Sequence, residues 1–236
     1  YEDSRHPKEV IFVRNLQEDL LRRDFTINAM AYNEKEGLVD IFGGMDDLKA
    51  GIIRCVGNAQ ARFSEDALRI LRGIRFAAQL GFELEDETRE GMRLLAPTLR
   101  KISAERIQVE LVKTLTSSRP DLLREAWKLG ITKEFLPEFD LAMETTQETV
   151  HHMYTVGEHI LHTLLEVRPD RILRLTMLLH DIGKPYMKTM DADGVAHFKG
   201  HPEKSSELAN EILHRLKFDN DTIRKVTKLV RYHDHR

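Results

Sequence analysis

Apolar positions recur at helical spacing from Ser64 to the end of the chain, and Gly, Pro or Ser residues interrupt the pattern at intervals. Ser64 is predicted to cap the first of these helices and Gly81 to end it. The polar stretch 145–149 has no period and predicts a linker, and Asp193-Gly194 predicts a two-residue hairpin turn. The predicted helices cover residues 65–80, 86–95, 103–115, 120–129, 154–167, 170–181, 202–216 and 220–232.

The pattern before about residue 60 is mixed. Asn15, with Glu18 three residues later, predicts the start of a helix that runs to Arg22. Short apolar runs predict strands over residues 10–13, 38–41 and 52–56. The fold class is therefore predicted to be mainly α, with a small α/β remnant at the start. The predicted domains cover residues 1–60, 61–145 and 146–236.

Composition narrows the possible classes of protein. The chain has 236 residues, and 36 Lys and Arg against 39 Asp and Glu leave a net charge of −3, so any nucleic-acid contact depends on local patches. The single cysteine excludes an internal disulfide framework, and no apolar run reaches the roughly 18 residues of a membrane span. We predict a soluble, cytoplasmic protein, and we expect further sequence before Tyr1 and after Arg236.

A row of arginines follows Ser64. On a helical wheel of about 100° per residue, Arg69, Arg72 and Arg75 fall on the half opposite the apolar arc. A solvated helix face would usually interleave acids with such a row, yet Asp66 is the main carboxylate within it. From this pattern alone, a cationic binding face and an exposed Asp–Arg pair with solvated arginines both stay open.

Four ordered motifs connect this row to a known family. They are Arg22–Met30, Asp40–Gly44, Ile53–Gly57 and Glu65–Phe76. Together, over about residues 10–110, they resemble the bacterial and eukaryotic branch of the tRNA nucleotidyltransferases, which includes CCA-adding enzymes and bacterial poly(A) polymerases. The resemblance implies a head remnant followed by a helical neck, and an enzyme that adds C, A or both to the 3′ end of tRNA from CTP and ATP.

The resemblance also implies roles for single residues. Asp66 and Arg69 would act as a protein template: the carboxylate accepts from the exocyclic amine of cytosine or adenine, and the guanidinium donates to the ring nitrogen. Guanine and uracil present the opposite polarity and would leave both side chains unpaired. By the same resemblance, Arg23 would contact the triphosphate and Asp24 would lie beside the ribose. Arg72 and Arg75 would support phosphate or order the template.

The catalytic carboxylates of the family form an Asp-x-Asp on a head strand that holds Mg²⁺. The one Asp-x-Asp here, Asp191–Asp193, precedes Gly194 and is predicted to be a turn. We therefore expect the Mg²⁺-binding pair upstream of Tyr1 and assign no catalytic residue within the chain. The chain is predicted to bind nucleotide weakly and not to polymerise alone.

All of the eleven histidines except His6 lie beyond residue 150. A lone histidine on an apolar face is usually a hydrogen-bonded core residue, but several that converge beside aspartates are hard to satisfy without a cation. The run His180-Asp181-Ile182-Gly183-Lys184 resembles the doublet of the HD phosphohydrolase superfamily, an all-α fold. This resemblance implies one or two divalent transition metals of open identity. The implied ligands are His159, His180, Asp181, His201, His233 and Asp234.

The main hypothesis is a tRNA nucleotidyltransferase with a fused HD domain, whose partners are tRNA, CTP and ATP. One alternative is a bacterial poly(A) polymerase with the same neck. Another takes the HD domain as the active part, a metal phosphohydrolase acting on a nucleotide or on a 2′,3′-cyclic RNA end. A third is a non-catalytic RNA-binding module, which the near-neutral charge does not favour. The oligomeric state is left open.

Overall fold

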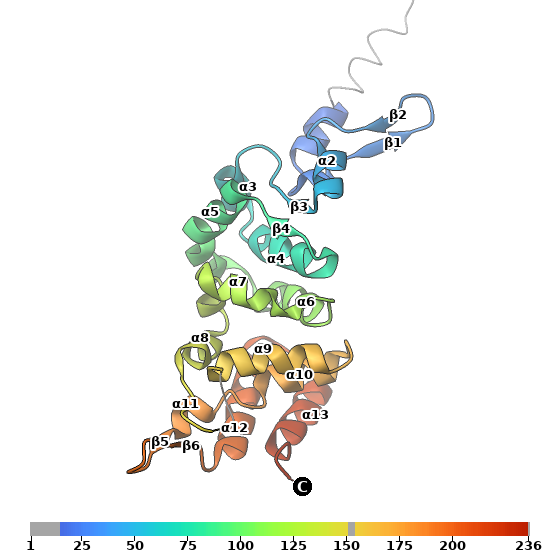
Figure 1. The fold of residues 1–236 in the computed structure, drawn as a ribbon. Helices are drawn as coiled ribbons and strands as arrows, with labels where there is room; N and C mark the ends of the chain where they lie inside the picture. The colour runs from blue at the N-terminus through green and yellow to red at the C-terminus, as the bar shows by residue number, and fades with distance from the viewer. Residues whose placement is uncertain (1–14, 151–153, 236) are drawn as a thin grey trace, which may run out of the picture.

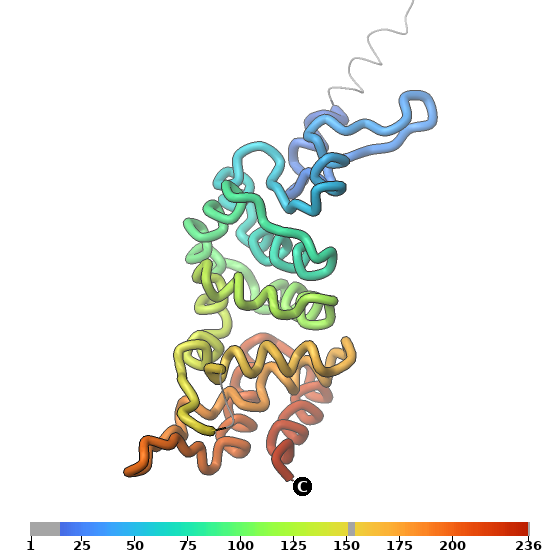
Figure 2. Tube along the Cα trace, in the orientation of Figure 1, coloured from blue at the N-terminus to red at the C-terminus, as the bar shows by residue number. Residues whose placement is uncertain are grey.

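The computed structural model describes residues 15–150 and 154–235. Its elements follow one another in chain order along an elongated molecule, from the N-terminal segment at one end to the last helices at the other (Figure 1). The Cα tube of Figure 2 follows the same course from the N-terminal segment to the C-terminal helices. The strand predicted over residues 10–13 lies outside the described residues.

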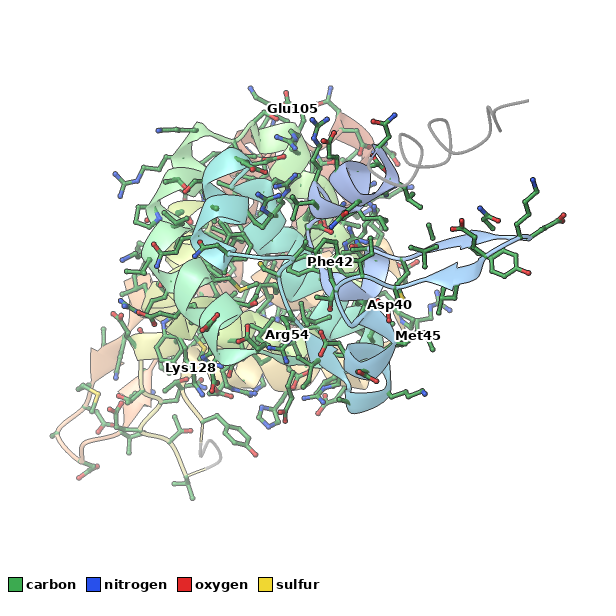
Figure 3. All side chains as sticks on the ribbon, turned by 90° about the horizontal axis from the view of Figure 1, so that it is seen from above. Asp40, Phe42, Met45, Arg54, Glu105 and Lys128 are labelled. Atoms are coloured by element: carbon green, nitrogen blue, oxygen red, sulfur yellow. The ribbon has the colours of Figure 1, made fainter. Side chains whose placement is uncertain are left out.

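The N-terminal segment has little regular structure. Residues 15–21 are helical, as predicted. The antiparallel hairpin of β1 (Ala31–Asn33) and β2 (Gly37–Val39) projects from the body of the molecule (Figure 3). The 3-10 helix η1 (Thr26–Asn28) precedes it, and α2 (Gly44–Ala50) follows. The sequence pattern did not predict α2, although Asp40 accepts hydrogen bonds from the Gly44 and Met45 amides at 2.7 and 2.9 Å.

The middle of the chain is almost entirely helical. Its one strand pair is parallel and joins β3 (Ile52–Ile53) to β4 (Glu83–Leu84). The α-helices of this part are α3 (Ala59–Glu65), α4 (Leu68–Leu80), α5 (Asp86–Leu95), α6 (Ala104–Leu115), α7 (Leu123–Lys128) and α8 (Pro137–Glu144). The 3-10 helices are η2 (Ala96–Lys101), η3 (Pro120–Leu122) and η4 (Thr132–Glu134).

The prediction of a single helix over 65–80 with Ser64 as its N-cap is wrong. Ser64 lies inside α3, which begins earlier because the Asn58 side chain accepts a hydrogen bond from the Ala61 amide. The backbone becomes extended at Asp66, with φ −153° and ψ 105°, and α4 then starts at Leu68. Asp66 therefore lies in the bend between two helices, not on the arginine-bearing helix.

The other helices of this part agree better with the prediction. α5 and α6 match the predicted ranges, and Ser103 caps α6 by accepting from the Arg106 amide. The helix predicted over 120–129 divides into η3 and α7. α8 was not predicted, although Pro137 at its first turn is typical of a helix start.

The C-terminal part packs four long helices and a small hairpin. Each long helix lies within one or two residues of its predicted start: α9 (Val156–Glu166), α10 (Arg171–Leu179), α12 (His201–Arg215) and α13 (Asn220–Arg231). The strands β5 (Thr189–Met190) and β6 (Ala196–His197) form the predicted hairpin around Asp193-Gly194. The prediction of a two-residue turn is wrong, because residues 191–195 connect the strands and the Asp191 side chain accepts from the Asp193 and Val195 amides. The short α11 (Lys184–Met187) follows the turn that carries His180 and Asp181.

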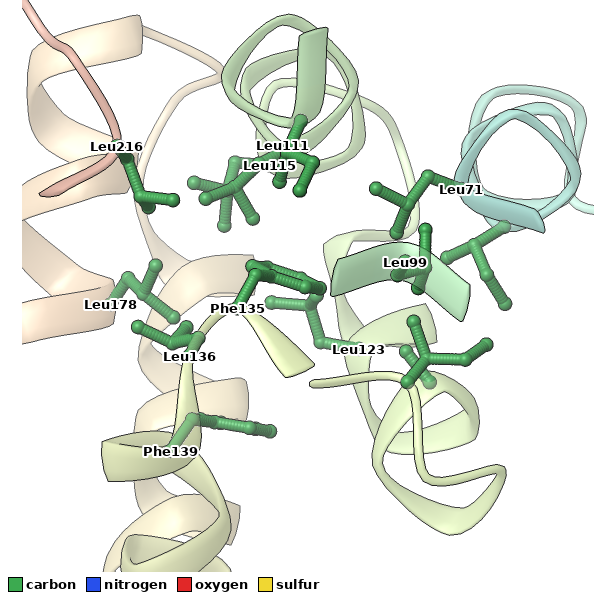
Figure 4. Packing of buried hydrophobic residues seen from close by; sticks show 14 of the residues in the cluster. Leu71, Leu99, Leu111, Leu115, Leu123, Phe135, Leu136, Phe139, Leu178 and Leu216 are labelled. Carbon is green, nitrogen blue, oxygen red and sulfur yellow. The ribbon is translucent and has the colours of Figure 1, made fainter. Parts of the chain in front are cut away.

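One continuous apolar core connects the middle and C-terminal parts. Figure 4 shows Leu111 and Leu115 of α6 together with Leu178 of α10 and Leu216, which follows α12. Hydrophobic burial of this kind is the main force that holds helices together. The boundary predicted near residue 145 therefore does not separate two independent cores, and the domain limits stay predictions.

Arg174 joins the same two parts through backbone groups. Its buried guanidinium donates to the carbonyls of Leu115 and Ser117, at the end of α6, at 2.6 and 3.1 Å. It also donates to the carbonyls of Val167 and Arg168 ahead of α10, at distances of 3.1 to 3.3 Å. The carbonyls at the end of a helix lack partners within that helix, so one side chain here satisfies a helix end and fixes a loop.

Replacement of Arg174 by methionine is expected to lower the free energy of unfolding by about 3 kcal/mol, because buried carbonyls lose their donor. Equilibrium urea denaturation measures the change. Arg168→Met, at an exposed position six residues earlier, is the control and is expected to stay within about 0.5 kcal/mol of the unmutated protein. An equally small effect of Arg174→Met would contradict the role given to this side chain.

Candidate nucleotide cleft and metal centre

A cleft of about 290 Å³ opens where the N-terminal segment meets α4 and α6. Its charged lining is strongly cationic, with five arginines against two aspartates. Five of the six residues predicted to bind nucleotide lie in it, and Arg75 does not. The lining residues are Arg22, Arg23, Asp24, Asn28, Asp66, Leu68, Arg69, Arg72 and Arg106.

Asp66 and Arg69 both line this cleft. The Asp66 carboxylate accepts a hydrogen bond from the Leu68 amide at 3.1 Å, so it caps the start of α4. The Arg106 guanidinium holds both carboxylate oxygens, at 3.3 and 2.7 Å. Partial burial works against ionisation, but the Arg106 hydrogen bond lowers the pKa of Asp66 below its ordinary value.

Arg69 is held by three acceptors. Its Nη1 donates to Glu65 Oε2 at 2.7 Å and to the Arg62 carbonyl at 3.1 Å, and its Nη2 donates to the Arg22 carbonyl at 3.1 Å. Sequence reasoning missed the parts of Glu65 and Arg106 in this arrangement. Glu65 directly precedes Asp66 in the motif, whereas Arg106 lies forty residues downstream on α6 and left no local signal.

Asp24 is buried beneath the cleft surface. It accepts from Arg72 Nε at 2.5 Å and from Asn28 Nδ2 at 2.7 Å. Arg72 therefore reaches from α4 to the N-terminal segment and fixes the two walls of the cleft relative to each other. Arg23 is exposed and forms an ion pair with Asp19 at 3.5 Å. A contact of Asp24 with a ribose, and of Arg23 with a triphosphate, stays a prediction.

Arg75 lies outside the cleft lining. Its guanidinium is buried and forms hydrogen bonds with Glu110 of α6 at 2.7 and 3.4 Å, and it stacks over the Phe76 ring at 4.3 Å. A buried charge needs a charged partner, and this pair ties α4 to α6. Of the two roles predicted for Arg75, contact with phosphate has no support in this position. The pair with Glu110 is compatible with the other role, ordering of the template, which stays a prediction.

The second site surrounds one buried carboxylate at the end of α10. Two imidazole Nε2 atoms approach each oxygen of Asp181. His159 and His180 lie 3.2 and 3.3 Å from Oδ2, whereas His201 and His233 lie 3.2 and 3.3 Å from Oδ1. The four histidines come from α9, the end of α10, the start of α12 and the turn after α13, so the predicted ligands do converge.

Backbone carbonyls orient the imidazoles. The Nδ1 atoms of His180, His201 and His233 lie 2.6, 3.0 and 2.6 Å from the carbonyl oxygens three residues earlier. Each Nδ1 therefore carries a proton, which leaves the Nε2 lone pair directed at the carboxylate unless that nitrogen is protonated as well. If all of these imidazoles were doubly protonated, several positive charges would surround one aspartate. Lys184 Nζ, which lies 3.2 Å from Asp181 Oδ2, would add another.

This arrangement fits a bound cation. Asp181 Oδ1 and His201 Nε2 are buried without a hydrogen-bond partner among the described residues. The donor atoms form two overlapping groups that could each hold a metal ion, and Asp181 is common to both. Burial opposes the ionisation of Asp181, but the adjacent His180 and the other imidazoles hold the pKa of its carboxyl well below its usual range. Asp181 is therefore ionised at neutral pH, as an anionic metal ligand must be.

Asp234 lies at the edge of the cluster. Its side chain is 57% exposed and approaches His201 and His233 at 3.4 and 3.5 Å. Lys184 is buried and donates to Gln147 Oε1 at 3.0 Å, so it is not a solvated surface lysine.

No helix within the described ranges is long and apolar enough to cross a membrane.

Three known families match successive segments of the chain. The family described as Poly A polymerase head domain matches residues 1–54. The probable RNA and SrmB binding site of polymerase A matches residues 81–143, and the HD domain family matches residues 149–236. These matches, in this order along the chain, confirm the predicted resemblance to the tRNA nucleotidyltransferases with a fused HD domain.

The similar proteins are CCA-adding enzymes. The CCA-adding enzyme of Leuconostoc mesenteroides is 52% identical over 213 residues, which cover 87% of this chain and 52% of that protein. The chain thus spans about half the length of this relative. The structure resembles a CCA-adding enzyme solved with CTP, with a TM-score of 0.60 and 25% identity over 94% of this chain and 48% of that one. The Thermotoga maritima CCA-adding enzyme complexed with tRNA has a TM-score of 0.57 and 26% identity, over 92% of this chain and 48% of that one.

Replacement of His180 by alanine is expected to weaken the binding of Mn²⁺ or Zn²⁺ by about tenfold or more, because one of the converging imidazoles is lost. Metal content after dialysis, measured by mass spectrometry, checks this. His214→Ala is the matched control: its Nδ1 also lies 2.8 Å from a backbone carbonyl, but its side chain is exposed and outside the cluster. Equal metal content in both variants would exclude the histidine cluster as the binding site.

Proposed function

We propose that this chain comprises part of the head, the neck and the HD domain of an enzyme that adds C, A or both to the 3′ end of tRNA, using CTP and ATP. The observation that carries the proposal is that one carboxylate, Asp66, and one guanidinium, Arg69, line the same arginine-rich cleft. The similarity to CCA-adding enzymes, some of them solved with CTP, ATP or tRNA, supports the same activity.

The pair selects the base by hydrogen-bond polarity. Asp66, ionised at neutral pH, only accepts, and Arg69 only donates. Cytosine and adenine offer an amine beside an acceptor nitrogen, so both contacts form. Uracil and guanine offer a carbonyl beside an N–H, which places an acceptor against Asp66 and a donor against Arg69. The wrong base leaves polar groups of a partly buried site unpaired, and this costs more than the lost contacts alone.

The remaining arginines bind the anionic parts of the substrate. Arg22 and Arg23 lie on the open side of the cleft, where their planar forks suit the oxygens of a triphosphate. Asp24 and Asp66 are each paired with an arginine, so neither is free to act as a magnesium ligand in this arrangement. The Mg²⁺-binding Asp-x-Asp expected before Tyr1 stays a prediction, and residues 191–193 form the hairpin turn instead.

The HD site supports a second candidate activity, a metal-dependent phosphohydrolase. His159, His180, His201 and His233 would hold the divalent metal together with Asp181. Such a metal supplies Lewis-acid activation of a phosphate ester and of water. The chain's own residues orient the metal ligands through the backbone carbonyls and keep Asp181 anionic. Nucleotides and 2′,3′-cyclic RNA ends are the proposed substrate class, and the cytosol, where tRNA and nucleotides meet, is the proposed location.

Replacement of Arg69 by alanine in the full-length gene product is expected to reduce the preference for CTP and ATP over UTP and GTP about tenfold or more, because the donor to the ring nitrogen is lost. Incorporation of each labelled nucleotide into tRNA that lacks its 3′ end measures the preference. Equal incorporation of all four nucleotides by the unmutated enzyme would contradict the protein template.

Replacement of Arg23 by alanine should raise the KM for CTP and ATP by about tenfold or more. Base preference should not change, because a triphosphate is common to all nucleotides. The same incorporation assay, repeated over a range of nucleotide concentrations, separates KM from kcat. A change in base preference would place Arg23 at the base and not at the phosphates.

Addition of long A tracts to RNA other than tRNA would favour the poly(A) polymerase alternative.

A further inference from the structure

We propose that Arg106 is a positioning residue for base selection: it fixes the Asp66 carboxylate so that a single acceptor position faces the incoming base. This inference rests on the proposed function of Asp66 and Arg69 in choosing the nucleotide. Arg106 belongs to neither of the helices around the bend and reaches the cleft from α6. Its role is therefore set by tertiary packing.

The hydrogen bonds of Asp66 leave one acceptor position open. An ionised carboxylate has about four lone-pair positions, two on each oxygen. The Leu68 amide and Arg106 Nη1 occupy Oδ1, at 3.1 and 3.3 Å. Arg106 Nη2 occupies one position of Oδ2 at 2.7 Å. Among the described residues no other donor reaches this carboxylate, so Oδ2 retains one position for the amine of the base.

Arg69 has complementary donors. A guanidinium carries five N–H bonds. Two at Nη1 serve Glu65 and the Arg62 carbonyl, and one at Nη2 serves the Arg22 carbonyl. Within the described chain the Nε–H and one Nη2–H remain for a ligand. One open acceptor beside open donors matches the Watson–Crick edge of cytosine or adenine and not that of uracil or guanine.

Asp66 needs this external support because the adjacent helix holds its carboxylate through a single hydrogen bond, from the Leu68 amide. Its backbone is extended between α3 and α4, and its short side chain can rotate about the terminal torsion. A planar guanidinium that binds both oxygens fixes the plane of the carboxylate, whereas a lysine ammonium is a point charge and leaves the plane free. The fork of Arg106, and not its charge alone, therefore orients the open lone pair.

The helix that carries Arg106, α6, is itself held in place by several contacts. Ser103 caps that helix, Ile107 and Leu111 are buried in the core, and Glu110 holds Arg75 of α4. Arg106 lies one turn before Glu110, so the same helix that is tied to α4 also carries the guanidinium. The pair itself is partly exposed, at 48% for Arg106 and 31% for Asp66, so it adds little to stability. Its loss is expected to change recognition more than folding.

The test compares Arg106→Ala and Arg106→Lys in the full-length gene product. The ratio of kcat/KM for CTP to that for UTP is measured, together with thermal unfolding. Arg93→Ala is the matched control, because Arg93 also grips a carboxylate with two nitrogens, in a pair 52% and 54% exposed, but lies outside the cleft lining. We expect both Arg106 variants to lose about tenfold in the CTP to UTP ratio, with melting temperatures like that of the control.

The outcomes separate this inference from the proposed function. An unmutated enzyme without a CTP preference would overturn the proposed function. A selective unmutated enzyme with equally selective Arg106 variants would overturn only the role of Arg106. A lysine variant that keeps full selectivity would show that charge suffices and would contradict the orientation argument. Greater selectivity or tighter CTP binding in Arg106→Ala would show that Arg106 competes with the base, and would also contradict it. If Arg106→Ala does not fold, the lysine variant decides.

Discussion

The packing of α4 against α6 is the constraint on which the nucleotide cleft depends. The buried ion pair of Arg75 and Glu110 fixes the position of α4 along α6, and the apolar faces of both helices pack around this pair. α4 supplies Arg69 and Arg72, and α6 supplies Arg106, so the wall of the cleft is defined once the two helices are in register. A buried pair of this kind contributes more to a unique arrangement than to net stability.

The two sites use polar groups in different ways. In the nucleotide cleft, arginines outnumber carboxylates, so the surface attracts anions and leaves selected hydrogen-bond positions open. In the histidine cluster one carboxylate is surrounded by imidazoles whose outer nitrogens are already bonded to backbone carbonyls. The first arrangement suits a ligand that arrives and leaves with each reaction cycle. The second suits an ion that stays bound, because several ligands must be released together.

Local sequence signals predicted much of this fold, and the misses have physical causes. The N-caps found in the structure, Ser103, Thr155 and Asp170, lie at or within one residue of the predicted helix starts at 103, 154 and 170, because a cap acts on its own first turn. The bend at Asp66 was missed because the apolar period continues through it. The partners of Arg75, Arg106 and Arg174 lie tens of residues away, and no pattern in a single sequence encodes such pairs. Motif resemblance supplied the candidate sites, whereas only coordinates separated Arg75 from the cleft.

The core shared by the middle and C-terminal parts makes these residues one thermodynamic unit. Side chains of α6 and α10 bury each other's surface, and Arg174 closes the same junction with hydrogen bonds to backbone. Neither part can lose its packing without exposing apolar surface of the other, so unfolding is cooperative across the junction. A destabilising substitution deep among the last helices would therefore lower the fraction of molecules whose candidate nucleotide cleft is folded, even though the substituted residue lies outside that cleft.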